Sequence, residues 1–595
     1  MPYHILRADL TAGTVVREEV PVDLIRRYLG GKGLAAHHLA TELPPGTDPL
    51  SPDNRLIFMT GPVSGIFPGT CRHVVVTKSP ATGGFLDTYA GGYFAWELRK
   101  AGLLGIIVTG RASVLSYLEV TESDARIVSA PDLAGATIAA TDDDPRFADF
   151  RVAAIGPAGE HQVGLACIGN NAGVTKRGRS GYNGRGGAGA VMGAKNLKAI
   201  AVKGGSGPAL SPEARELRTA LSQKIRADGS PSSWLAGSGT PTIVDWTNGV
   251  HVLPTRNWSA GSFEGAGTIG SRPVIENLLS REGCYNCSVK CGPHVRTTGG
   301  AFPGAEADKL EYETIGLGAS NTGNADFSAI VKFAEVCDHL GLDTISSGVA
   351  VAFTMDCAER GLIDHPIRFG DSEGQIRLTE DIAYKRGLGA DLSHGIAHAA
   401  EVWGIDDAAV PVFQVKNLEY PAYDPRGSVA MALAYATSDR GGCHMRSWPI
   451  AIEALSDDPK ADPFTAQGKA AFVVGEQDEN AAEWSLVGCD FIGYDKDDAA
   501  RMLDAVGIEV SADEYSALGR RVWNLVRLFN LREGWTAADD SLPRALAIPL
   551  TDSGRSFDPE VFAQMKNEYY GVRGWDAEGR PTAELVRELG LEEYA

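Results

Sequence analysis

The chain lacks the charge and the hydrophobic runs that several classes of protein need. Its 595 residues carry 55 Lys and Arg against 76 Asp and Glu, a formal net charge of −21, so no basic surface for nucleic-acid phosphates is expected. The most apolar stretch, AGLLGIIVTG, is far too short to cross a bilayer. The start, MPYHILRADL, has no basic region followed by an apolar core, so we expect no secretory signal. These features favour a cytoplasmic protein that binds neither nucleic acid nor membrane.

Cysteine is also scarce, and only three of the cysteines stand close together in the sequence. An odd total of nine cysteines, clustered around one motif, does not indicate a disulfide framework and fits a reducing compartment. Five of them are most simply buried apolar residues, although one lies beside a histidine and is a candidate for a pocket wall: Cys71, Cys167, Cys337, Cys357 and, next to His444, Cys443.

The informative cysteines stand in the run CYNCSVKC, at Cys284, Cys287 and Cys291. The spacing C-x₂-C-x₃-C brings three thiolates round one tight loop, which suits three corners of a cubane iron–sulfur cluster. Cys489, in SLVGCDFIG, is the best candidate for the fourth ligand. Zinc is the alternative. His294 could complete a mononuclear site, but the chain has no second, similarly spaced cysteine pair. The spacing favours a cluster that carries electrons.

Patterning predicts a sheet-rich first part and a helical remainder. Strand-like segments recur up to residue 204, and a helix over 22–43 is expected to break at Gly30–Gly31. Ser211, Pro212 and Glu213 mark a helix start, after which helical periodicity dominates. A second boundary is suggested by the proline-rich segment NLEYPAYDPRG. We therefore expect domains at 1–209, 210–415 and 416–595.

Glycine is abundant, with 71 residues concentrated in loops near the strand ends. Three of these loops are GIFPGTCRHVVV, DTYAGGYF and NGRGGAGAVMGAKNLKAIAVKG, and Arg72 and Arg185 lie in or beside them. Glycine lets backbone N–H groups approach an anion, and arginine adds bidentate charge. Neither the dinucleotide fingerprint nor the Walker loop is present in its required context. Tight turns alone are the simpler reading of any one loop, but three of them beside a cluster motif favour a large phosphorylated cofactor.

Nearly the whole chain resembles the tungsten-containing aldehyde ferredoxin oxidoreductase family. The segments that carry the resemblance include GGKGLAAHHL, GGYFAWELRKAG, GRGGAGAVMGAKNLKAIAVKG, GCYNCSVKCGPHVR, LEYETIGLGASN, CDHLGLDTISSG and YPAYDPRGSVAMALAYATSDRGGCHMR. The resemblance implies an α+β fold: an N-terminal β-sheet-rich domain followed by two mainly helical domains, with the cofactor between them. The implied cofactor is tungsten, or molybdenum, held by two pterins next to a 4Fe–4S cluster.

The resemblance also implies roles for individual residues. Cys284, Cys287, Cys291 and Cys489 take the cluster positions, and Arg72 stands between cluster and pterin. The loops that hold the pterin phosphates and a bridging Mg²⁺ correspond to Tyr89, Ala90, Gly91, Arg185, Gly186 and Gly187. Tyr89 stands where the family often has asparagine, so a backbone carbonyl would have to serve there.

One pterin-recognition motif is intact and its second copy is altered. The intact motif is D-x-x-G-L-D at Asp338, Gly341, Leu342 and Asp343, where Gly341 should end one helix and Asp343 should cap the next. The second copy, D-x-x-G-L-C in the family, reads WSLVGC here. Trp484 replaces the aspartate, the glycine is shifted to Gly488, and Glu483 or Asp490 is left to supply a carboxylate.

The implied chemistry is oxidation of an aldehyde to a carboxylic acid, reversible at a low potential. Glu313, with Tyr312 beside it, and His444 match the family's active-site positions, where they would move a proton and bind the substrate carbonyl. Electrons would leave through the cluster to ferredoxin or a partner subunit, in a homodimer or larger complex. Two alternatives stay open. One is a relative that acts on aromatic acyl-CoA thioesters or on 2-hydroxy and 2-oxo acids. The other is an electron-transfer subunit without the pterin metal.

Overall fold

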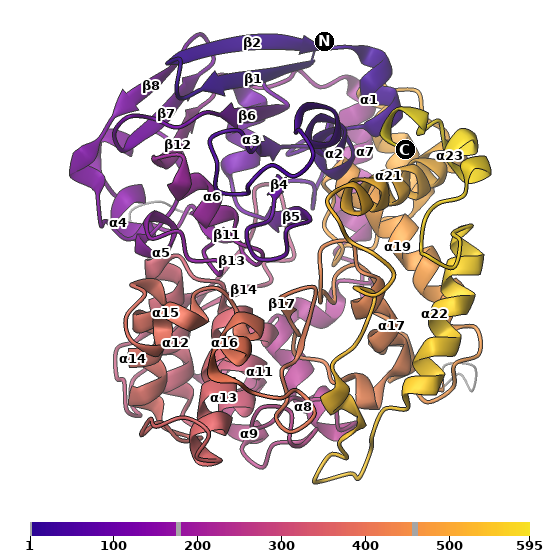
Figure 1. Ribbon diagram of the computed structural model, residues 1–595. Coiled ribbons are helices and arrows are strands. Elements are labelled where there is room, and N and C mark those ends of the chain that lie inside the picture. The colour runs from indigo at the N-terminus through magenta and orange to yellow at the C-terminus, as the bar shows by residue number, and fades with distance from the viewer. Residues whose placement is uncertain (1–2, 174–179, 455–461) are drawn as a thin grey trace.

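The computed structural model describes residues 3–173, 180–454 and 462–595. Figure 1 shows a sheet-rich upper part made by the first third of the chain, with helices below it and the C-terminal helices along one side. The predicted α+β class, with a sheet-rich part followed by helical parts, is confirmed. Among the described residues, no helix combines the length and apolar character needed to cross a bilayer.

Two six-stranded sheets form the upper part. The first has the order β2-β1-β6-β3-β4-β5 and the second β11-β10-β9-β12-β7-β8. Their strands are β1 (Tyr3–Asp9), β2 (Thr14–Val20), β3 (Leu56–Met59), β4 (His73–Lys78), β5 (Phe85–Ala90), β6 (Gly105–Thr109), β7 (Ser116–Thr121), β8 (Ala125–Ser129), β9 (Arg151–Ala154), β10 (Ile168–Asn170), β11 (Gly181–Asn183) and β12 (Leu197–Lys203). One hydrophobic cluster takes Phe58 and Ile106 from the first sheet and Leu118 and Ile200 from the second. The sheets therefore pack on each other through a shared core.

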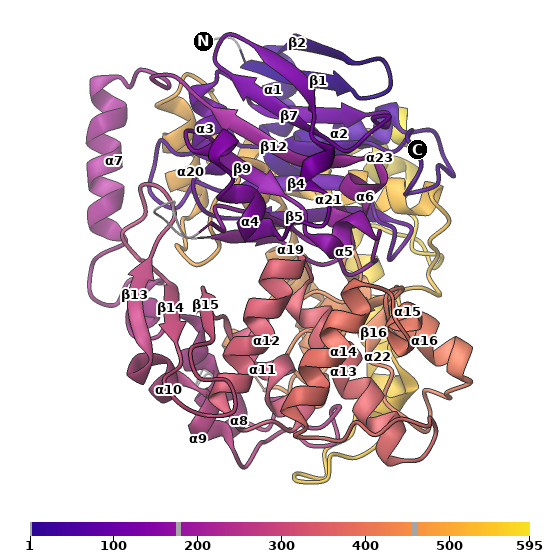
Figure 2. The ribbon, with the colours of Figure 1, turned by 90° about the vertical axis from the view of Figure 1, so that its left-hand side faces the viewer.

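Helices lie both below the sheet-rich part and beside it (Figures 1 and 2). The main ones are α7 (Pro212–Lys224), α11 (Tyr312–Gly318), α12 (Phe327–Leu340), α13 (Thr344–Glu359), α14 (Ser372–Ala383), α16 (Ile396–Trp403), α17 (Val429–Thr437), α19 (Lys469–Leu486), α20 (Lys496–Asp504), α21 (Ala512–Arg532), α22 (Pro559–Arg573) and α23 (Ala583–Leu589). Ser211 caps α7 as predicted, because its hydroxyl accepts the N–H of Ala214 at 3.1 Å.

The helical part contains a small sheet that the patterning did not predict. Strands β13 (Leu278–Glu282), β14 (Gly292–Arg296) and β15 (Glu306–Asp308) pair in that order, all antiparallel. The cysteine motif forms the connection between β13 and β14. The segment DTYA also differs from expectation. It completes strand β5, with Val74 opposite Tyr89, rather than a loop.

The break between α1 (Val22–Tyr28) and α2 (Gly31–Glu42) has a clear cause. Gly31 has φ +37, and a Cβ on it would lie 2.1 Å from the carbonyl oxygen of Trp484. The N–H of Gly30 donates to the carbonyl of Ser485 at 3.1 Å. The predicted interruption is therefore the point where the C-terminal end of α19 docks on the N-terminal part, more than four hundred residues away in sequence.

Candidate functional site

Five cysteines line one small cavity beneath the sheet-rich part. Cys284, Cys287 and Cys291 come from the β13–β14 connection, and Cys489 comes from the turn after α19. The fifth, Cys71, precedes β4 and was not expected here. We call this the cysteine cavity. The N–H of Gly92 donates to the sulfur of Cys284 at 3.3 Å.

The cysteine cavity suits a polynuclear group better than a single ion. Over the described ranges, no three His, Cys, Asp or Glu side chains are close enough to share one metal ion. Gly69, Gly91 and Gly283 line the cavity together with the cysteines. A Cβ on Gly91 would lie 2.6 Å from the sulfur of Cys284, so only glycine leaves room there. His294, the zinc candidate, instead pairs with Glu306, with Nε2 and Oε1 at 2.6 Å.

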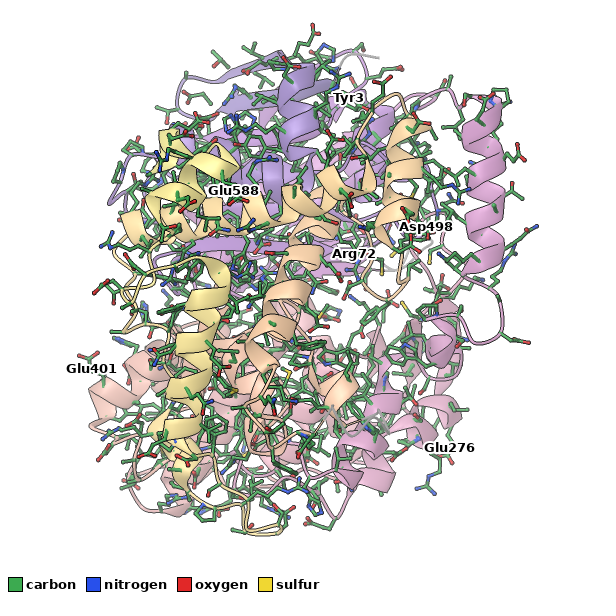
Figure 3. The ribbon with its side chains drawn as sticks, turned by 90° about the vertical axis from the view of Figure 1, so that its right-hand side faces the viewer. Tyr3, Arg72, Glu276, Glu401, Asp498 and Glu588 are labelled. Carbon is green, nitrogen blue, oxygen red and sulfur yellow. The ribbon has the colours of Figure 1, made fainter. Side chains whose placement is uncertain are left out.

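Arg72 connects the cysteine cavity to a second and larger one. It lines both, and its Nη1 lies 2.6 Å from Oδ1 of Asp490. Figure 3 labels Arg72 at the level where the sheet-rich part meets the helices. Asp490 is thus paired with an arginine.

The second cavity has a volume of about 260 Å³. We call it the arginine cavity, because Arg72, Arg185, Arg440 and Arg446 line it. Within the described residues, no hydrogen-bond partner meets Nε and Nη1 of Arg185, Nε of Arg440 or Nη1 of Arg446, although all are buried. Buried guanidinium donors without acceptors are costly, and a polyanion would satisfy them. The cavity therefore fits the phosphates of a pterin cofactor.

The intact recognition motif lies in the arginine cavity. Asp338, Leu342 and Asp343 line it. Gly341 ends α12 with φ +79, and Asp343 caps α13 by accepting the N–H of Ser346 at 3.0 Å. Burial raises the pKa of the Asp338 carboxyl well above its usual range.

The altered motif reaches the same cavity from the end of α19. Trp484 lines it, and Val487 ends α19 with φ +63. Neither of the two candidate replacement carboxylates lines the arginine cavity, and Oε1 of Glu483 is buried without a hydrogen-bond partner among the described residues. Asp490 pairs with Arg72. Glu483 packs on Gly488, where a Cβ would lie 2.9 Å from the Cγ of Glu483.

The residues of the predicted phosphate loops do not all line the same cavity. Tyr89 and Arg185 line the arginine cavity, and Gly91 lines the cysteine cavity. Ala90 ends β5 between them. Gly186 and Gly187 have φ +72 and +83, and they form the turn that leads from Arg185 into helix α6 (Ala188–Ala194). The side chain of Tyr89 is already engaged, since its hydroxyl donates to Oδ2 of Asp87 at 2.6 Å.

A third cavity of about 300 Å³ adjoins the arginine cavity. Its wall is rich in rings, so we call it the aromatic cavity: Trp234, Tyr312, Tyr423, Trp448 and Phe491 line it. Five residues line both the aromatic and the arginine cavity and form the boundary between them: Glu311, Glu313, His444, Met445 and Phe491. Phe491 also lines the cysteine cavity.

Glu313 and His444 form the polar pair at this boundary. The Oε2 of Glu313 accepts the N–H of Ala422 at 2.8 Å, and its Oε1 lies 3.6 Å from Nε2 of His444. Burial raises the pKa of Glu313 to about 8. Burial, and then the positive charge of Arg185, lowers the pKa of His444 below its usual range. At neutral pH, the proton therefore resides on the carboxyl and the imidazole is neutral.

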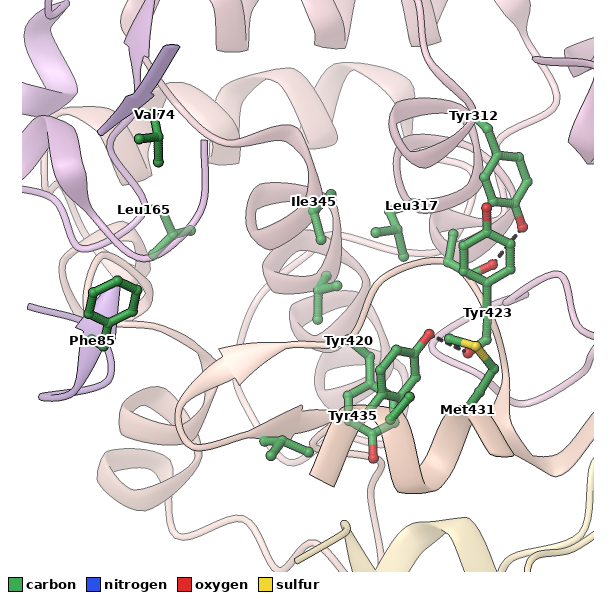
Figure 4. Packing of buried hydrophobic residues seen from close by; sticks show 14 of the residues in the cluster. Val74, Phe85, Leu165, Tyr312, Leu317, Ile345, Tyr420, Tyr423, Met431 and Tyr435 are labelled. Atoms are coloured by element: carbon green, nitrogen blue, oxygen red, sulfur yellow. Dashed lines mark hydrogen bonds between the residues drawn. The ribbon is translucent and has the colours of Figure 1, made fainter. Parts of the chain in front are cut away.

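Tyr312 lies beside this pair, but its hydroxyl is already hydrogen-bonded to the backbone. Its hydroxyl donates to the carbonyl of Ala422 at 2.5 Å, and its ring packs on that of Tyr423 (Figure 4). The hydroxyl of Tyr435 in turn donates to the carbonyl of Tyr423 at 3.0 Å. Tyr312 thus holds the segment that supplies the N–H to Glu313.

Sequence reasoning missed a buried ionic network behind the arginine cavity. Lys32 lies 2.9 Å from Asp87 and 2.5 Å from Asp439, measured between Nζ and the nearest carboxylate oxygen. Arg446 pairs with both aspartates, with Nε 2.8 Å from Oδ1 of Asp439. The only available signal was the basic segment DRGGCHMR, which carries Arg440 and Arg446. The sulfur of Cys443 accepts a hydrogen bond from Nη2 of Arg440 at 3.0 Å, and Cys443 lines neither the arginine cavity nor the aromatic cavity.

Two family models cover almost the whole chain. The model described as aldehyde ferredoxin oxidoreductase, N-terminal domain, matches residues 5–204. The model described as aldehyde ferredoxin oxidoreductase, domains 2 and 3, matches residues 216–591.

Individual relatives agree with these matches. A tungsten-containing aldehyde ferredoxin oxidoreductase of Pyrococcus furiosus is 34% identical, with 99% of this chain and 98% of the relative aligned. A protein of the same description from Thermococcus kodakarensis is 35% identical, with the same coverage of 99% and 98%. A solved structure, the active-site complex BamBC of benzoyl coenzyme A reductase with 1,5-dienoyl-CoA, matches with a TM-score of 0.83. That match has 25% identity and covers 100% of this chain and 98% of that one.

Proposed function

Since the chain belongs to the aldehyde ferredoxin oxidoreductase family and is an oxidoreductase, we propose that it is a cytoplasmic tungsten bis-pterin enzyme that oxidises an aldehyde to a carboxylic acid. Aldehyde and water give the acid, two protons and two electrons. The observation that carries the proposal is the Glu313–His444 pair, which lies on the boundary between the aromatic cavity and the arginine cavity. A substrate in the first would meet a cofactor in the second at these two side chains.

The residues of the arginine cavity fit the cofactor. Arg185, Arg440 and Arg446 have guanidinium nitrogens without hydrogen-bond partners among the described residues, which suit phosphate oxygens. Asp338 lines the cavity from the last turn of α12, and Asp343 lines it from the N-terminus of α13. The glycine turn of Gly186 and Gly187, and the backbone at Tyr89 and Ala90, would complete the phosphate and Mg²⁺ site. When bound, the tungsten–pterin group supplies the two-electron redox chemistry.

Glu313 and His444 would handle the proton and the carbonyl. The protonated carboxyl of Glu313 can donate a hydrogen bond to the carbonyl oxygen of the substrate, which polarises it. The neutral imidazole of His444, 3.6 Å away, can accept a proton released in the reaction. Tyr312 would act indirectly, through the backbone segment that binds Glu313.

Electrons would leave through a 4Fe–4S cluster held by Cys284, Cys287, Cys291 and Cys489. Arg72 lines both the arginine cavity and the cysteine cavity, so a cluster and a pterin would share this cation. The acceptor would be ferredoxin or an iron–sulfur subunit, and the active form a homodimer or larger complex.

A second candidate is reduction of an aromatic acyl-CoA thioester, favoured by the similarity to the benzoyl coenzyme A reductase complex. The size of the aromatic cavity argues against the thioester. Its volume of about 300 Å³ lies at the small end of the range of about 300–1,000 Å³ typical of ligand sites. A compact aldehyde fits it better than a thioester with a long carrier.

The test is a comparison of both substrate classes with protein purified without oxygen. We expect aldehydes, aromatic ones included, to reduce a low-potential viologen dye, and we expect no oxidation of the reduced dye by benzoyl-CoA. If benzoyl-CoA oxidises the reduced dye and no aldehyde reduces the oxidised dye, the second candidate replaces the first.

A further inference from the structure

The two helix ends that enter the arginine cavity have the same backbone but opposite chemistry. Gly341 ends α12 and Val487 ends α19, with φ +79 and +63, and each donates its N–H to the carbonyl four residues back. The residue three positions before each, Asp338 and Trp484, lines the cavity. A left-handed valine is strained, because its branched Cβ crowds the carbonyl. The turn is therefore kept although its glycine and its carboxylate have both been replaced.

Trp484 holds an arginine on its face. The guanidinium carbon of Arg446 lies 4.3 Å from the centroid of the indole ring, well within the range of a cation–π contact. Both side chains are buried, with 2% and 0% of their surface exposed. Tyr89 closes the group, with its ring centroid 5.4 Å from that of Trp484.

The orientation of Arg446 leaves one nitrogen available. Its Nε and Nη2 are taken by Asp439 and Asp87. Its Nη1 is buried without a hydrogen-bond partner in the described part of the chain, and Arg446 lines the arginine cavity. An aspartate at position 484 would compete for this guanidinium as an acceptor. An indole instead stabilises the cation and leaves its donor free.

We propose that the end of α19 binds the second pterin with a guanidinium held on an indole instead of with a carboxylate. In this arrangement Trp484 is a positioning residue for Arg446, and Nη1 of Arg446 donates a hydrogen bond to an oxygen acceptor of that pterin. The first helix end keeps its carboxyl groups, so the two halves of the site recognise their ligands with opposite donors and acceptors. The inference rests on the proposed function, because it requires the bis-pterin cofactor.

The test counts pterin, tungsten and iron per chain in protein purified without oxygen, with pterin measured as its fluorescent oxidation product. Trp484→Leu removes the aromatic face, and we expect it to lower pterin per chain by about twofold or more, with iron unchanged. Trp484→Phe keeps a face and should retain most of the pterin. The matched control is Trp523→Leu, since Trp523 is also buried, at 1% exposure, with Arg573 5.0 Å from its ring centroid in a distant pair.

The results for the variants and for the wild type test the inference and the proposed function separately. Wild-type pterin content in a folded Trp484→Leu protein would overturn the inference and leave the proposed function standing. Wild-type protein without pterin would overturn the proposed function itself. If circular dichroism shows that Trp484→Leu is unfolded, Arg446→Lys decides, because it keeps the charge but loses the guanidinium fork. Pterin at the wild-type level in that variant would equally overturn the inference.

Discussion

Replacing Glu313 with alanine is expected to lower kcat/KM for aldehyde oxidation by about 10²–10⁴-fold, the usual contribution of a positioned acid or base. The change removes the only carboxyl within reach of Nε2 of His444 among the described residues that line the aromatic cavity. It also leaves the N–H of Ala422 without its acceptor. Steady-state kinetics with a viologen acceptor would measure the loss, and cofactor content would show that binding is intact.

The same residue predicts a pH dependence. Burial raises the pKa of Glu313 to about 8, so the hydrogen-bond donor is present below that pH and is lost as the pH rises through it. We expect kcat/KM of the wild type to fall on the alkaline side of pH 8. Glu313→Gln keeps a donor that does not titrate, so its lower rate should lack this decline. A decline of the same size in Glu313→Gln would show that another group is responsible.

Replacing Cys489 with alanine is expected to abolish electron transfer to ferredoxin and to remove most of the iron. Three thiolates of one loop can hold three corners of a cubane, and the fourth corner depends on the turn after α19. Iron analysis and the electron paramagnetic resonance spectrum of the reduced protein would measure the effect. Cys357→Ala is the matched control, since Cys357 is a fully buried cysteine of α13. Wild-type iron and an unchanged spectrum in Cys489→Ala would exclude Cys489 as a ligand.

Local features of the site were predictable because they depend on neighbouring residues. The cysteine spacing, the helix end at Gly341 and the cap at Asp343 are set within a few positions of sequence. The start of α7 at Ser211 is of the same kind. The convergence of Glu313 and His444 came from family resemblance rather than from any local pattern.

Features that depend on distant contacts were not predictable. The β13–β15 sheet has short strands with few apolar residues, so it gave no clear periodicity. The sequence indicated that Cys71 is a buried apolar residue, but in the structure it lines the same cavity as Cys284. Arg446 reaches Asp87 across more than three hundred residues, and the pKa of Glu313 is set mainly by burial in the folded chain.

Metal analysis of protein purified without oxygen, from cells supplied with tungsten and molybdenum, tests most directly whether the protein is a tungsten enzyme. We predict about one tungsten and about four irons per chain, as one bis-pterin group and one cubane require. Iron at that level with neither tungsten nor molybdenum would contradict the enzyme and leave a protein that only transfers electrons.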